Sequence, residues 1–142
     1  MAGQMVHVEI PAGDTAKARA FWGGLFGWQF QAYEGSPTEY QMTRFSETQG
    51  GAITEADGEK RGPRVYFDVD DINAQKARVG ELGGESGEAY PVPSMGWFAV
   101  CKDSEGNEFG LWQTDPNAPG ASPPFVRGRR GRVRRPRTTS VR

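Results

Sequence analysis

Two short stretches of the chain carry polar side chains at alternate positions, the spacing that places them on one face of a β-strand. His7 and Glu9 lie two residues apart in MVHVEI, and Arg64, Tyr66 and Asp68 keep the same spacing in RVYFD. A histidine beside a carboxylate can transfer protons, and a guanidinium can hold a carboxylate or phosphate through two parallel hydrogen bonds. We therefore predict His7 and Glu9 as catalytic groups, and Arg64, Tyr66 and Asp68 as ligand-binding groups.

Each polar set opens a segment whose pattern occurs twice, with an offset of 57 residues. In the first copy a strand at 5–10 precedes a helix that begins at Asp14 and ends near Gly27. In the second copy a strand at 63–69 precedes a helix at 71–82. Aspartate caps the first amides of a helix, and glycine adopts the left-handed conformation that ends one.

Further short strands complete each copy. We predict them at 28–33, 39–46 and 50–55, and then at 84–90, 95–102 and 108–113. The last two are joined by a turn in which Gly106 suits a positive φ. The sequence thus predicts an α+β domain over residues 1–114, with two tandem βαβββ modules at 5–55 and 63–114. Their polar faces should enclose a cleft in a curled mixed sheet, while the apolar faces pack on the helices.

Aromatic residues add to the predicted cleft. Trp112 shares the register of Gly110, and together with Tyr66 it predicts a roomy aromatic pocket for a small molecule. Trp97 is a further ligand-binding candidate whose direction depends on the register of its strand.

Composition bounds the class of protein. The chain has 142 residues, of which 36% are apolar, enough for one globular domain. No apolar run is long enough to cross a bilayer and the first residues lack a signal-peptide layout, so we expect a soluble cytoplasmic protein. The single cysteine, Cys101, is expected to be a packed structural thiol.

Charge is distributed unevenly. Residues 1–124 carry a net charge of −9, whereas residues 125–142 carry eight arginines and no acid. We predict that 115–124 is a linker and that 125–142 is a disordered tail able to bind nucleic acid weakly and without sequence preference. A solubilising tail, an arm lying on the acidic body and a segment without function are the alternatives.

The tandem modules, the helix end FWGGLFGW and the closing DSEGNEFGLW together resemble the vicinal oxygen chelate superfamily, which includes glyoxalase I, bleomycin-resistance proteins and extradiol dioxygenases. The resemblance covers residues 5–114. It implies the glyoxalase fold, a homodimer and a small-molecule ligand, and, if the protein is an enzyme, a lyase, isomerase or dioxygenase-like activity.

Metal-dependent members of this superfamily place ligands at four repeat-related strand positions, which the resemblance assigns here to His7, Ile53, Arg64 and Gly110. Isoleucine and glycine offer no side-chain donor, and guanidinium has no acceptor. Glu9 and Asp68 stand near enough to supply an oxygen each. We expect no metal and no cofactor.

Three functions stay open. The first is metal-free binding of an aromatic or anionic small molecule, with Arg64 as the anion anchor. The second is a metal-dependent glyoxalase-like lyase or isomerase. The third is nucleic-acid binding through the tail. Arg64 has an alternative role as an ion-pair partner of Glu9 or Asp68, and His7 as a hydrogen-bonded cleft histidine.

Overall fold

The computed structural model describes residues 2–56, 58 and 62–120. Its elements are β1 (Met5–Ala12), α1 (Thr15–Phe26), β2 (Gln31–Ala32), β3 (Tyr40–Arg44), β4 (Gly50–Glu55), β5 (Arg64–Asp68), α2 (Ile72–Glu81), β6 (Glu85–Val92), β7 (Gly96–Lys102) and β8 (Glu108–Thr114). The order β-α-β-β-β is therefore repeated as predicted. The predicted tail, residues 125–142, lies outside the described residues.

The helix ends follow from local side-chain chemistry. The Asp14 carboxylate accepts a hydrogen bond from the Lys17 amide at 3.0 Å, and Gly27 ends α1 in the left-handed region with φ 70°. The Asp71 carboxylate accepts from the amides of Asn73 and Ala74, both at 3.1 Å, and so caps α2. These caps satisfy amides that have no partner within the helix, which is why both helices begin where the sequence predicts.

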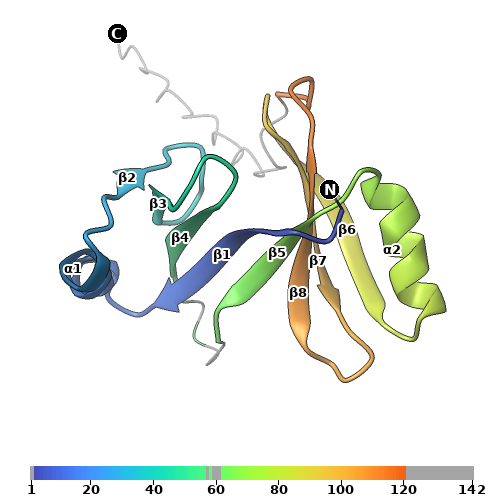
Figure 1. Ribbon diagram of the computed structural model, residues 1–142, viewed down its shortest axis with the longest axis horizontal. Helices are drawn as coiled ribbons and strands as arrows, with labels where there is room; N and C mark the ends of the chain where they lie inside the picture. The colour runs from blue at the N-terminus through green and yellow to red at the C-terminus, as the bar shows by residue number, and fades with distance from the viewer. Residues whose placement is uncertain (1, 57, 59–61, 121–142) are drawn as a thin grey trace, which may run out of the picture.

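The strands form one eight-stranded mixed sheet with the order β2-β3-β4-β1-β5-β8-β7-β6. Within each half the first strand pairs in parallel with the last, β1 with β4 and β5 with β8. The halves join through the antiparallel pair β1–β5. Figure 1 shows the outer strands of each half rising on either side of this central pair, with the helices on the outer sides. The predicted α+β fold is confirmed.

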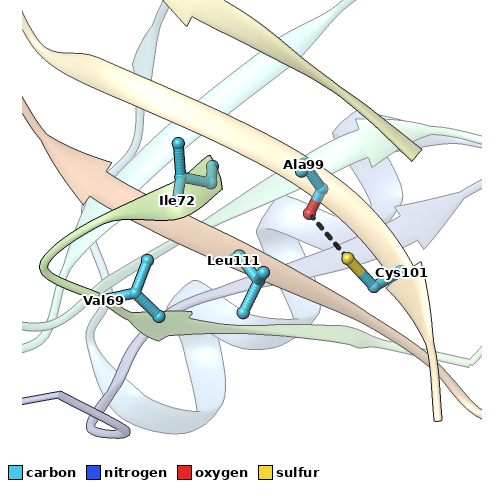
Figure 2. Close-up of a cluster of buried hydrophobic side chains, with 5 residues drawn as sticks. All are labelled: Val69, Ile72, Ala99, Cys101 and Leu111. Atoms are coloured by element: carbon cyan, nitrogen blue, oxygen red, sulfur yellow. Dashed lines mark hydrogen bonds between the residues drawn. The ribbon is translucent and has the colours of Figure 1, made fainter. Parts of the chain in front are cut away.

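The main hydrophobic core lies in the second half, where α2 packs on β6, β7 and β8. Its buried members, drawn in Figure 2, are Val69, Ile72, Ala99, Cys101 and Leu111. The Cys101 thiol is 2% exposed, and burial raises its pKa, as a structural thiol requires.

Two segments differ in extent from the prediction. β2 has two residues instead of six, because Trp28 stacks on Trp22 at 5.2 Å, packs at a tilt against Phe45 at 4.5 Å and is not paired in the sheet. At the other end, residues 115–118 of the predicted linker are held on the domain. The Asp115 amide donates to Met95 O at 2.9 Å, and the Ser94 amide donates to Ala118 O at 3.1 Å. No helix in the described ranges is long and apolar enough to span a membrane.

Candidate functional site

A cleft of about 2290 Å³ lies against the face of the sheet opposite α2. His7 and Glu9 line it from β1, and Arg64, Tyr66 and Asp68 line it from β5. The alternation in the sequence therefore placed all five residues on the correct face. The antiparallel register adds what the sequence did not contain: His7 lies beside Tyr66, and Glu9 beside Arg64. The two polar sets form one continuous floor.

Glu9 is the centre of a hydrogen-bond network on this floor. Its Oε1 accepts from the Tyr66 hydroxyl and from Arg64 Nη1, the latter at 3.4 Å. The Arg64 Nη1 also donates to the Tyr66 hydroxyl oxygen at 3.3 Å. On its other side, Arg64 Nη2 donates to Glu108 Oε1. Arg64 is thus held between two carboxylates contributed by β1 and β8.

This arrangement decides the charge environment of Arg64. Its side chain is 24% exposed, and those of Glu9 and Glu108 are 16% and 27% exposed. Burial by itself would lower the pKa of Arg64, but the hydrogen bonds that it donates to Tyr66 and Glu108 outweigh burial, and the pKa rises. Among the described residues, the ion-pair partners of Arg64 are Glu9 and Glu108. Of the two roles open from the sequence, the structure provides the contacts for ion pairing with Glu9.

His7 lies at the end of the same network. A hydrogen bond of 2.7 Å joins His7 Nε2 to the hydroxyl of Tyr40, and the edge of the Tyr66 ring packs at 5.5 Å between centroids. Burial lowers the pKa of His7, against the smaller opposing effect of Glu9, so the imidazole is neutral near pH 7. Burial and then the charge of Glu9 raise the pKa of Tyr40 and of Tyr66. Both phenols are therefore neutral hydrogen-bond donors.

Gly110 does not open a pocket. A Cβ added there would lie 2.6 Å from Tyr66 Cγ and closer still to the edge of the ring. The register places Tyr66 directly beside Gly110 on the neighbouring parallel strand, so the phenol covers the glycine. The predicted roomy pocket beside Gly110 is wrong, because Tyr66 already fills that space.

Ile53 is not a cleft position. It is 1% exposed and does not line the cleft, whereas its neighbours Gly50 and Thr54 do. The strand register pairs Glu9 with Ala52 in the first half and Tyr66 with Gly110 in the second. The offset between the halves is therefore 57 for the first strands but 58 for the last. Assigning Ile53 as a ligand-equivalent position is wrong because the register puts Ala52 there, and Ala52 is itself only 2% exposed and does not line the cleft either.

The same change of offset from 57 to 58 residues reverses the direction in which the Trp97 side chain points. Its indole packs beside the core under α2, and its Nε1 donates to Asp115 Oδ2 at 3.1 Å. Trp97 does not line the predicted cleft but borders a separate, smaller cavity beside α2, and Phe98 is the residue of β7 that lines the cleft. Trp112 does line the cleft, and its ring lies over Gly96, with Cζ2 2.6 Å from an added Cβ.

Sequence reasoning missed two members of the site, Tyr40 and Glu108. Glu108 lies two residues before Gly110 on β8 and so shares its face, a signal that alternation alone could have provided. Tyr40 lines the cleft from β3 at the position that matches Phe98 by the 58-residue offset. The 57-residue offset relates Tyr40 to Trp97, so only the 58-residue offset could have identified Tyr40 as a cleft residue.

The donor set does not fit the metal of the superfamily. Arg64 brings a cation to one ligand position, the Tyr66 ring covers the glycine at another, and Ala52 offers no donor at a third. Within the part of the chain that the structure describes, no three His, Cys, Asp or Glu side chains form a group that could hold a metal ion. A second cation beside Arg64 would also be repelled.

Comparisons with known proteins agree with this fold. A model of the glyoxalase-like domain matches residues 6–112. A glyoxylase-like domain-containing protein of Didymella fabae is 34% identical over 118 residues, covering 74% of this chain and 89% of that protein. The protein CFP32 of Mycobacterium tuberculosis is 27% identical over 118 residues, and the chain spans only 45% of its length.

Solved structures give the same architecture. A methylmalonyl-CoA epimerase from Mycobacterium tuberculosis superposes with a TM-score of 0.61 at 16% identity, over 80% of this chain and 89% of that one. A variant of the Streptomyces coelicolor methylmalonyl-CoA epimerase superposes with a TM-score of 0.63 at 15% identity, over 84% and 99%. At such identities the likeness establishes the fold alone.

Proposed function

Because the chain belongs to the glyoxalase-like domain family of the vicinal oxygen chelate superfamily, we propose that it binds a planar small molecule in its cleft without a metal ion. The observation that supports the proposal is the set of side chains at the positions that the resemblance assigns to metal ligands. Tyr66 packs on Gly110, and Arg64 is held between Glu9 and Glu108. This floor supplies a fixed cation and hydrogen-bond donors of its own.

The walls favour a flat apolar ligand. Aromatic side chains line the cleft from several strands and from the residues that flank β2: Phe30, Tyr33, Tyr40, Tyr66, Tyr90, Phe98 and Trp112. Such surfaces stack on planar groups, while a few convergent polar side chains orient them. His7 and Tyr40 are the polar pair that we assign to orienting the ligand, because their hydrogen bond lies on the cleft floor.

The charge of the cleft argues for a neutral or cationic ligand. Among the described residues that line it, five are acidic and two are basic: Glu9, Glu47, Glu55, Asp68 and Glu108 against Arg44 and Arg64. Arg64 is already neutralised by its two partners. An aromatic cation is therefore favoured over the anion that Arg64 alone had suggested, and sequestration of such a compound is the function that fits best.

Two planar probes of opposite charge test the proposal, an aminoacridine cation and an anilinonaphthalene sulfonate anion. We expect the cation to quench the tryptophan fluorescence and to bind at least tenfold more tightly than the anion, with or without a chelator. Trp112→Phe should remove most of the quenching. Trp97→Phe is the matched control, because Trp97 faces the core under α2, and it should leave the quenching in place.

A charge variant sharpens the test. Asp68→Asn should weaken binding of the cation by about 1 kcal/mol, roughly fivefold, and leave the anion no weaker. Tighter binding of the anion, loss of binding in chelator, or quenching that depends on Trp97 instead of Trp112 would each reject the proposal.

Proton transfer by His7 is the second candidate, favoured by the neutral state that burial imposes on its imidazole. Glu9 already accepts from Tyr66 and Arg64, which makes His7 the better base. Once a ligand is identified, exchange of its acidic C–H protons with deuterated water, followed by NMR, should be faster with the parent protein than with His7→Gln. Equal rates would limit His7 to binding.

A further inference from the structure

The outer surface of α1 carries a continuous run of apolar side chains that the cleft does not use. Phe21, Leu25 and Phe26 are 57–60% exposed, although each is a large hydrophobic residue. Trp22 connects Phe21 and Phe26, with ring centroids at 5.3 and 6.0 Å. Together with Trp28 and Phe45, these residues form what we call the α1 aromatic patch.

The rings of the patch contact one another in sequence. Trp22 stacks on Trp28 at 5.2 Å with an interplanar angle of 9°, and Trp28 packs on Phe45 at 4.5 Å. Phe45, 39% exposed, closes the patch at the side of β3. None of its six residues lines the cleft or the smaller cavity beside α2. The patch is thus an exposed surface and not a small-molecule pocket.

The internal repeat provides a comparison within the same molecule. The 57-residue offset relates Phe21 to Arg78, which forms an ion pair with Glu81 at 2.9 Å on the solvated side of α2. α2 covers β6, β7 and β8, while α1 packs mainly on β4. Where α2 presents Arg78 and Glu81 to water, α1 presents Phe21, although Leu25 and its repeat-related residue Leu82 are both exposed. Helix formation and packing therefore do not explain the aromatic surface of α1.

We propose that the α1 aromatic patch is the interface of a homodimer, in which it packs against the same patch of a second copy. With rings of about 150–250 Å² each and the exposures above, the four most exposed side chains present roughly 400 Å² of apolar surface. This is about half of the ~800 Å² per partner that a standard-size interface buries, so residues around the patch must supply the remainder in the dimer we propose. A twofold pairing needs such a self-complementary surface.

The distribution of charge favours α1 as the surface that a second copy contacts. Residues 1–124 carry a net charge of −9, so two copies repel one another over most of their surface. α1 contains no acidic residue and carries only Lys17 and Arg19, which makes it the region where acidic bodies meet at least cost. Figure 1 places α1 at one end of the longest dimension, and none of the patch residues lines the cleft.

Sedimentation of the full chain tests the interface, with a matched pair of variants. Leu25→Glu places a carboxylate in the patch at a position 57% exposed, and Leu82→Glu does the same at the repeat-related position, 63% exposed. We expect the parent and Leu82→Glu to sediment as dimers at micromolar concentration and Leu25→Glu to dissociate, with a dissociation constant at least tenfold higher. Circular dichroism confirms folding, which exposed positions should tolerate.

High salt separates this interface from association through the arginines of residues 125–142. An apolar contact persists in salt, whereas binding by those arginines is lost. A monomeric parent, a dimer that Leu25→Glu leaves intact, a dimer that Leu82→Glu disrupts equally, or a dimer that dissociates in salt would each overturn the proposal.

Discussion

Replacing Gly110 by alanine tests whether Tyr66 occupies the place of a metal ligand. The added Cβ would lie 2.6 Å from Tyr66 Cγ, whereas carbon atoms in good contact lie about 3.5–4.0 Å apart. β8 pairs with both β5 and β7, so its backbone cannot move away. The Tyr66 ring must move instead, and its hydroxyl then loses contact with Glu9 and Arg64.

The expected cost follows from these two effects. Overpacking a core position costs about 1–3 kcal/mol, and a hydrogen bond to a charged group contributes about 1.5–3 kcal/mol. Because the ring relieves the overlap by giving up its hydrogen bond, we expect Gly110→Ala to lower the free energy of unfolding by about 1.5–3 kcal/mol. Urea denaturation followed by tryptophan fluorescence measures this change.

A double-mutant cycle assigns the cost to Tyr66. In a Tyr66→Ala background, Gly110→Ala should cost less than about 0.5 kcal/mol, whereas in Tyr66→Phe, which keeps the ring, most of the penalty should persist. Gly80→Ala is the control, because an added Cβ on α2 meets nothing within 4 Å and should raise stability by about 0.5–1 kcal/mol. An unchanged penalty in Tyr66→Ala would refute the assignment of Tyr66 to the ligand position.

Three further predictions concern the metal, pH and the tail. Purified protein should contain no near-stoichiometric nickel, zinc, iron or manganese after mild dialysis; a metal that disappears in His7→Ala would contradict this. Because the pKa of His7 is lowered in the folded protein, the unfolded state takes up the His7 proton first as the pH falls below the ordinary value of 6.5. Above that pH, His7 should therefore not reduce the free energy of unfolding. Below it, the free energy of unfolding should decline with falling pH by at most about 1.4 kcal/mol per unit, and His7→Gln should remove that part of the slope in urea titrations. Residues 125–142 should bind duplex DNA or RNA weakly, with an affinity that falls steeply with salt; binding that survives their deletion, or that prefers a sequence, has another source.

The elements and their faces followed from the sequence because they depend on neighbours along the chain. Asp14 and Asp71 cap their helices through amides two or three residues away. Alternation placed His7, Glu9 and Arg64 on the cleft face, since side chains of a strand point to opposite sides at every step. The fold class needed no more than these local patterns and their repetition.

The register of the later strands was decided only in three dimensions. A single residue separates the offset that the helices obey from the offset of β7 and β8, and one residue exchanges the two faces of a strand. Trp97 therefore lies in the core while Phe98 lines the cleft, and Ile53 is buried where Ala52 faces Glu9.

Sequence determined which groups of β1 and β5 reach the cleft, and tertiary structure determined what those groups can do there. Arg64 has the features of an anion anchor when considered alone. The pairing of β1 with β5, and of β5 with β8, instead brings Glu9 and Glu108 to its two sides. These contacts join residues 55 and 44 positions apart, and no local pattern encodes them because strand order is set by the packing of the whole sheet.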